Sequence, residues 1–182
     1  IELFGLKEYF HITKNEIVNK TTGSKILFRG IKTSSGDQSA NLKSLQGITT
    51  FVVEEAEELV DEDTFDKIDL SVRQQGITTF VVEEAEELVD EDVFDKIDLS
   101  VRQKGVQNRV ILVMNPATKE HWIYKRFFEQ AGVTGGTNTT KGDTTYIHTT
   151  YKDNEANVSK SFIMNMDRMR RDRPKKYLLE IL

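Results

Sequence analysis

The sequence predicts an α/β fold in which a parallel sheet is flanked by helices. Three apolar runs, at residues 48–53, 77–82 and 110–114, are rich in β-branched side chains and suit strands that are covered on both faces. A helical pattern follows each of the first two runs. Because strands that alternate with helices favour parallel pairing through right-handed crossovers, we expect the three runs to form one sheet.

The composition excludes several classes of protein. The chain has 182 residues, enough for one domain or for one domain with a tail. It contains no cysteine, which excludes a disulfide scaffold, a thiolate metal site and a cysteine nucleophile. A membrane span needs about 18 consecutive apolar residues, and no run here approaches that length. The N-terminal residues lack the pattern of a secretory signal, which predicts a cytoplasmic location.

The N-terminal segment, residues 1–32, alternates apolar and polar positions around a turn-rich centre at residues 19–24. This pattern predicts a hairpin or a pair of strands. Residues 31–45 are rich in Ser, Gly and Asp, and they predict a loop that ends in a short helical turn.

A repeat dominates the middle of the chain. Residues 46–74 recur directly as residues 75–103, and the two copies differ only in Thr64 against Val93. Two nearly identical copies indicate a recent tandem duplication inside an ordinary domain, and an assembly artefact is the alternative. Each copy has nine acidic and two basic residues, so the repeat accounts for the acidity of a chain whose net charge is −5. The overall charge therefore does not exclude a nucleic-acid partner.

Each copy is predicted to form one strand followed by one helix. Asp61 and Asp90 can cap the two helices. The apolar residues of each helix are spaced i, i+3 and i+7 and form one stripe. They are Phe65, Ile68 and Val72 in the first copy and Phe94, Ile97 and Val101 in the second.

The remaining elements follow the third strand. A helix is expected at residues 119–130, a Gly/Thr-rich loop at residues 132–144 and a short strand near residues 146–150. A final helix begins at about Ser159 and runs into a basic segment that Pro174 interrupts.

The residues that suggest chemistry stand at the ends of the first two strands. Glu54 and Glu55 follow one run, and Glu83 and Glu84 follow the other. In open α/β sheets the ligand site lies outside the carboxyl ends of the strands. There, one carboxylate can hold Mg²⁺ while the next polarises the water that attacks a γ-phosphate. An acidic cluster that caps a helix is the alternative interpretation.

Four segments, in order along the chain, resemble one family. Residues 43–59 resemble the Walker B region of bacteriophage terminase large subunits, the motor ATPases of DNA packaging. Residues 23–30 are similar to the strand upstream of Walker B in that family. Residues 111–118 with 121–128 are similar to its coupling motif and the helix that follows, and residues 148–154 to the closing motif of its ATPase domain. Together the four segments cover most of the chain between residues 23 and 154.

The resemblance implies a role for each candidate residue. Glu54 or Glu83 corresponds to the acid associated with Mg²⁺, and Glu55 or Glu84 to the catalytic glutamate. Asn115 corresponds to the polar coupling position that senses the γ-phosphate, although an Asn-Pro turn after a strand is also common. Only one copy is expected to occupy the site, and the sequence does not indicate which. In the intact family the cofactors are Mg²⁺ and ATP.

One motif of the family is absent from the sequence. No G-x-x-x-x-G-K-[ST] occurs, so the backbone amides and the lysine that hold the β- and γ-phosphates are missing. The chain is therefore expected to be a fragment with a partial P-loop NTPase-like sheet that lacks the Walker A portion. Residues 1–154 would be the C-terminal part of the ATPase domain and residues 155–182 the start of a helical linker subdomain. Alone, it is not expected to hydrolyse ATP or to bind these cofactors.

The resemblance also implies partners, namely double-stranded viral DNA, the portal and the small terminase subunit in the bacterial host cytoplasm. Exchange of the duplicated unit between two molecules would give a homodimer. A second hypothesis is a non-enzymatic remnant that binds nucleic acid or protein, for example through the basic residues 168–176. A third, an acidic phosphoacceptor pocket, needs a lysine at another strand end, and no convincing lysine is found.

Overall fold

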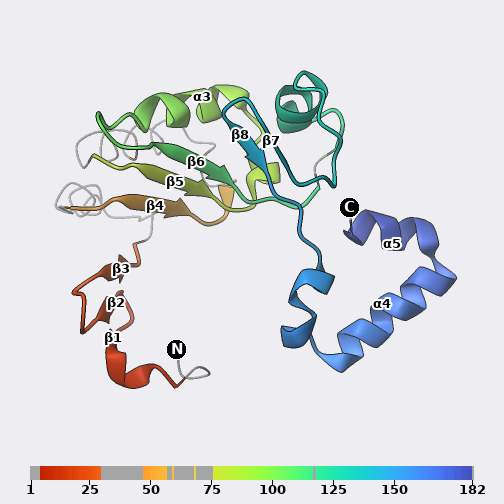
Figure 1. The fold of residues 1–182 in the computed structure, drawn as a ribbon, viewed down its shortest axis with the longest axis horizontal. Helices are drawn as coiled ribbons and strands as arrows, with labels where there is room; N and C mark the ends of the chain where they lie inside the picture. Colours follow the sequence, from red (N-terminus) through yellow and green to blue (C-terminus); the bar gives the residue numbers. More distant parts are fainter. Residues whose placement is uncertain are drawn as a thin grey trace, which may run out of the picture. The chain divides into compact units, whose positions relative to one another are not determined.

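A computed structural model of the chain describes residues 5–29, 47–56, 59, 68, 76–116 and 118–181 (Figure 1). The chain forms two compact units, Ile1–Gln46 and Gly47–Leu182. The loop expected at residues 31–45 lies outside the described residues.

The first unit contains a small antiparallel sheet. A 3-10 turn, η1 (Lys7–Tyr9), leads into β1 (Phe10–Ile12), and β2 (Glu16–Asn19) pairs with both β1 and β3 (Lys25–Leu27). The Asn19 side chain closes the turn after β2 by accepting hydrogen bonds from two successive backbone N–H groups, at 2.9 and 3.0 Å. The prediction of a hairpin or a pair of strands is thus confirmed, with a third strand added. β3 belongs to this antiparallel sheet and not to the parallel one.

The second unit contains the predicted parallel sheet. Its strands are β4 (Thr50–Val53), β5 (Thr79–Val82) and β6 (Arg109–Leu112), in the order β4-β5-β6. Figure 1 shows the three arrows side by side and pointing the same way. β4 and β5 are the same segment in the two copies, and they pair in parallel with each residue opposite its own equivalent. The repeat therefore extends the sheet by one strand.

Only one face of this sheet is well covered. Val53, Phe80 and Val82 share a face and are at most 1% exposed. On the opposite face Val52 is 50% exposed and Ile111 is 41% exposed. The expectation that the strands would be covered on both faces is therefore wrong for β4 and β6, because the layer that usually covers the second face of a parallel sheet is not present in the described part of the chain.

The helix of the second copy forms as predicted. Helix α3 (Glu91–Ser100) is capped by Asp90, whose side chain accepts a hydrogen bond from the Asp92 N–H at 2.9 Å. Its stripe of Phe94, Ile97 and Val101 is buried. The corresponding helix of the first copy lies outside the described residues, except for Ile68, which is as fully buried as Ile97.

The helix expected at residues 119–130 is shorter and has an unusual geometry. Residues Tyr124–Glu129 form η4, a π-helix, with i→i+5 hydrogen bonds such as Gln130 N–H to Lys125 O at 2.9 Å. In this geometry residues five apart lie one above the other. Trp122 and Phe127 can therefore both pack on Phe94, with ring centroids 5.2 and 5.5 Å away.

Within residues 132–150, the boundaries of the expected loop and strand are wrong. Residues Thr139–Lys141 (β7) and Thr144–Tyr146 (β8) form a hairpin, and residues 147–150 are not a strand. Gly142 has a φ of 62°, which suits the two-residue turn between them. The β-branched threonines that flank this turn favour strands, so a hairpin forms where the Gly/Thr content suggested a loop.

The chain ends in three helical segments, η5 (Tyr151–Asn157), α4 (Lys160–Asp172) and α5 (Pro174–Ile181). Ser159 caps α4 by accepting a hydrogen bond from the Phe162 N–H at 3.2 Å, which confirms the predicted start. Pro174 separates the two helices because it is the first residue of α5, where proline is well tolerated. Among the residues that the structure describes, no helix has the length and apolar character needed to cross a membrane.

Candidate functional site at the carboxyl ends of the parallel strands

The parallel sheet brings the predicted site residues to one edge. Val53 is opposite Val82, and Val82 is opposite Leu112, so the three strands end level with one another. Glu54 and Glu55 follow β4, Glu83 and Glu84 follow β5, and Asn115 comes three residues after β6. All five of these residues are exposed. The arrangement agrees with a ligand site outside the carboxyl ends of parallel strands.

The second glutamate of each pair adopts a strained backbone conformation. Glu55 has a φ of 59° and Glu84 a φ of 52°, and no other non-glycine residue in the described part of the chain has a positive φ. A non-glycine residue in this left-handed region costs about 1–3 kcal/mol, and such residues cluster at functional sites. The two copies thus share one backbone strain, at the position that the family resemblance predicts to be the catalytic glutamate.

The strained residue turns the chain back toward β6. A 3-10 turn, η3 (Ala85–Glu87), follows Glu84 directly. The Ala85 N–H donates to the Val113 carbonyl at 3.0 Å, and the Ala85 side chain is fully buried. The segment Glu83–Ala85 therefore makes a sharp turn that is hydrogen-bonded to the residue after β6.

A further glutamate joins this turn to the end of β6. Asn115 Nδ2 donates to Glu86 Oε1 at 2.7 Å. Glu86 Oε2 is buried and accepts no hydrogen bond in the described structure. Sequence reasoning missed Glu86, because the contact needs β5 and β6 to be neighbours and nothing in the acidic cluster distinguishes this glutamate from the others.

The structure shows which copy lies beside β6. The Trp122 indole N–H donates to the Leu88 carbonyl at 2.5 Å, and Arg126 forms ion pairs with Glu91 at 3.0 Å and Asp95 at 2.7 Å. All three partners belong to the second copy, as does β5. The second copy therefore occupies the strand position next to β6, and the first copy forms the outer strand.

Arg126 also illustrates the electrostatics of this contact. Partial burial by itself lowers the pKa of Arg126, but the hydrogen bonds to Asp95 and Glu91 outweigh it and raise the pKa. The guanidinium lies 4.8 Å from the centre of the Phe94 ring. The arginine stays charged and holds the π-helix against α3.

The strand-end glutamates suit a magnesium ion that is also bound by water or substrate phosphates, and not one that is enclosed by protein ligands alone. Carboxylate oxygens are suitable ligands for Mg²⁺, which is usually held by one or two carboxylates together with water and substrate phosphates. In the described residues no three Asp, Glu or His side chains are grouped to hold a metal by themselves. The strand-end carboxylates are chemically suitable ligands for an ion that takes its other ligands from water or from substrate phosphates.

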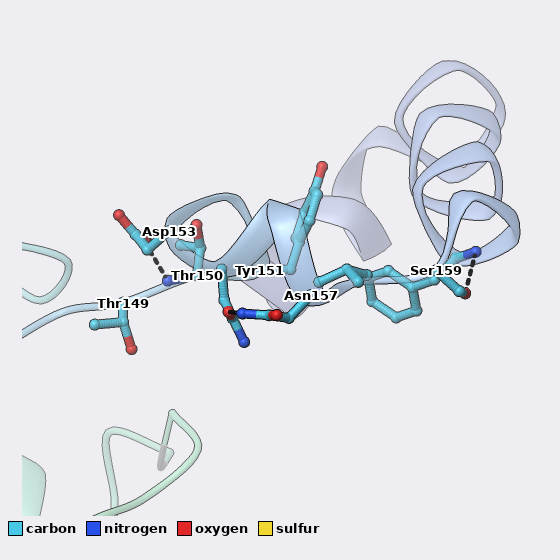
Figure 2. Close-up of a pocket in the computed structure, with 9 residues that line it drawn as sticks. Thr149, Thr150, Tyr151, Asp153, Asn157 and Ser159 are labelled. Carbon is cyan, nitrogen blue, oxygen red and sulfur yellow. Dashed lines mark hydrogen bonds between the residues drawn. The ribbon is translucent and has the colours of Figure 1, made fainter. Parts of the chain in front are cut away.

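A separate open pocket lies near the C-terminal helices (Figure 2). Thr150 and Asp153 form a capping box at the start of η5, in which the Thr150 N–H donates to Asp153 Oδ2 at 2.7 Å. This hydrogen bond and a second one from the Thr150 hydroxyl lower the pKa of Asp153. Tyr151 packs edge-on against Phe162, and a hydrogen bond with the Tyr177 hydroxyl raises the pKa of Tyr151 to about 12. None of the strand-end residues lines this pocket.

The sequence matches one family of known proteins. The family model described as "Phage terminase large subunit" matches residues 1–81 and residues 71–182, so the two segments together cover the chain. The first segment contains all of the first copy, and the second contains all of the second copy. No curated protein matches the chain significantly.

Proposed function

The chain belongs to the phage terminase large subunit family, and from this premise we propose that residues 47–116 form the Walker B half of a DNA-packaging ATPase site. The observation that carries the proposal is the strained Glu84 at the end of β5, joined through its turn to Asn115 at the end of β6. Strain at an acidic residue on the ligand edge of a parallel sheet is typical of a catalytic position.

This proposal gives one role to each of two glutamates of the second copy and one role to Asn115. Glu83 is the carboxylate that holds Mg²⁺, and Glu84 is the base that orients and polarises the attacking water. Asn115 senses the γ-phosphate with its amide. Mg²⁺-ATP, when bound, supplies the phosphoryl group and neutralises its charge. Glu54 and Glu55 of the first copy are the displaced equivalents, one strand further from Asn115.

We further infer that this chain does not hydrolyse ATP by itself. Its sequence has no phosphate-binding loop, so the largest source of phosphate affinity is missing. The proposed organisation remains an ATPase portion at residues 1–154 and the start of a helical linker at residues 155–182. Viral DNA, the portal and the small terminase subunit are the proposed partners of the intact protein in the host cytoplasm.

A transplant tests this proposal. The compact unit Gly47–Leu182, which includes Trp122 and Arg126, would replace the corresponding segment of an intact relative that has its own phosphate loop. We expect the hybrid to hydrolyse ATP, and Glu84→Gln to reduce kcat by roughly 100-fold or more while nucleotide binding persists. Glu87→Gln is the matched control, because Glu87 is exposed on the same turn. A hybrid that folds and binds nucleotide but never hydrolyses it would contradict the proposal.

A binding module is the second candidate function. The basic residues around the bend between α4 and α5 are all exposed, which suits contact with nucleic-acid phosphates. They are Arg168, Arg170, Arg171, Arg173, Lys175 and Lys176. DNA binding by the full chain that weakens with salt, and that is lost when the first three arginines are changed to Gln, would support this candidate.

A further inference from the structure

The contact between Glu86 and Asn115 does more than join two strand ends. A carboxylate can only accept hydrogen bonds, so the amide nitrogen of Asn115 must face Glu86 and its carbonyl oxygen must face away. The 2.7 Å distance is that of a charge-assisted hydrogen bond. Without the carboxylate, the exposed Asn115 amide would be free to turn over.

The position of the Glu86 carboxylate is energetically unfavourable. Glu86 Oε2 is buried and unpaired in the described structure, and a buried unpaired carboxylate oxygen is unfavourable. The neighbouring Glu87, on the same turn, is exposed. Buried polar atoms that lack a partner call for an explanation beyond stability.

The turn that carries Glu86 is fixed at two points. Its N-terminal residue, Ala85, is hydrogen-bonded to Val113, two residues before Asn115. Its second residue, Glu86, holds the Asn115 side chain itself. The strained Glu84 immediately precedes this turn. The geometry of Glu84 and the orientation of Asn115 are therefore set by the same short segment.

The second copy is the one placed to make this contact. Glu57 is the equivalent of Glu86 in the first copy, and the strand next to the first copy is β5. At the position where β6 is followed by Asn115, β5 is followed by Ala85, which has no amide side chain. The identical sequence thus stands next to a different strand end in each copy.

We propose that Glu86 is a positioning residue that holds the Asn115 amide nitrogen toward the turn after β5, leaving the Asn115 carbonyl oxygen and one N–H for a ligand. That a ligand binds at Asn115 rests on the proposed function. The orientation of the amide rests only on the hydrogen bond to Glu86. Glu86 would act through Asn115 and would not touch the substrate.

NMR of the side-chain amides of the full chain tests the orientation. One Asn115 amide proton is expected downfield of its partner, because it is hydrogen-bonded to Glu86 Oε1. Glu86→Gln should keep the downfield proton, since a Gln carbonyl still accepts. Glu86→Ala should bring both protons to solvent-like shifts. Glu87→Gln, the control, should leave the Asn115 signals unchanged.

A polarity swap gives a second variant. In Glu86→Gln/Asn115→Asp the amide and the carboxylate exchange places. The downfield proton should therefore reappear on the new side-chain amide at position 86 of the double variant, and it should be absent in Asn115→Asp alone. Asn115 signals that are the same in a folded Glu86→Ala chain would overturn the inference.

The hybrid ATPase separates this inference from the proposed function. In an active hybrid, Glu86→Ala should lower kcat by roughly tenfold to a hundredfold with little change in KM, and Glu86→Gln should recover part of that loss. An unchanged kcat in Glu86→Ala overturns the positioning role. An inactive hybrid whose Asn115 signals behave as expected refutes the proposed function and leaves the amide orientation standing.

Discussion

Glu55 and Glu84 hold a left-handed backbone conformation in two copies of one sequence. Both follow a strand of identical sequence, and both precede a buried alanine, Ala56 or Ala85. The strain therefore arises from the local sequence and not from one particular neighbour. The sequence predicted a functional role for these glutamates. It did not predict their left-handed conformation, because glycine usually occupies such positions and none is present here.

This strain leads to a prediction for the first copy. Glu55→Gly should raise the free energy of unfolding by about 1 kcal/mol, since glycine adopts positive φ without penalty. Glu54→Gly should lower it, because Glu54 has no positive φ and glycine adds only chain entropy. Urea denaturation of the two variants checks this. A Glu55→Gly chain that is less stable than the wild type would contradict the account.

Among the elements, the second strand-helix unit and the π-helix are held together by contacts between distant residues. Asp90 and the stripe of α3 could be read from the sequence because capping and periodicity are local signals. The π-helix could not, since it depends on Trp122 and Phe127 both meeting Phe94, some thirty residues earlier in the chain. Gly142 is typical of a two-residue hairpin turn, but the high Gly/Thr content of the segment favoured the prediction of a loop.

The two copies provide matched controls for the contact between α3 and the π-helix. Asp95→Asn should destabilise the chain by about 0.5–1 kcal/mol, because it breaks an ion pair that is only half exposed. Asp66→Asn, the same change in the first copy, should have a smaller effect. Thermal unfolding of both variants measures the difference. Equal destabilisation by the two substitutions would mean that either copy can occupy the position beside β6.

The capping box of η5 gives a pH-dependent prediction. The pKa of Asp153 is lowered by hydrogen bonds from Thr150, so its contribution to stability is present above the unfolded pKa of about 3.9. That contribution is lost as the pH falls through the lower, folded pKa. Asp153→Ala should therefore cost stability at pH 7 and cost progressively less below about pH 4.

Unfolding at several pH values, with Glu155→Ala as an exposed control on the same helix, measures this effect. A stability deficit in Asp153→Ala that grows on acidification would be inconsistent with the lowered pKa.

At the scale of the whole molecule, the repeat adds a strand without disturbing the sheet. Val53, Ala56, Leu59 and Ile68 of the first copy are as buried as their equivalents in the second. The parallel sheet could be predicted from the sequence because alternating strands and helices leave few other topologies. The choice of copy could not, since identical segments carry no information about their neighbours. It depends on residues after β6, namely Trp122 and Arg126.

The same equivalence makes an exchanged homodimer a prediction for the intact chain. If a unit of one molecule occupies the position beside β6 in another, light scattering should detect a dimer whose fraction rises with concentration. Deleting residues 46–74 should abolish that dimer, because the remaining copy occupies the position beside β6 in its own chain and no additional copy is left for another molecule. A wild-type chain that stays monomeric at high concentration would reject the exchange.

The most direct test of the central claim compares the same substitution in the two copies within one hybrid ATPase that carries the compact unit Gly47–Leu182. We predict that Glu84→Gln lowers kcat by roughly 100-fold or more while Glu55→Gln leaves ATP hydrolysis close to that of the parent hybrid. Loss of hydrolysis in Glu55→Gln with normal activity in Glu84→Gln would show that the wrong copy has been assigned to the site. Full activity in both single variants and in the double variant Glu55→Gln/Glu84→Gln would show that neither glutamate is catalytic.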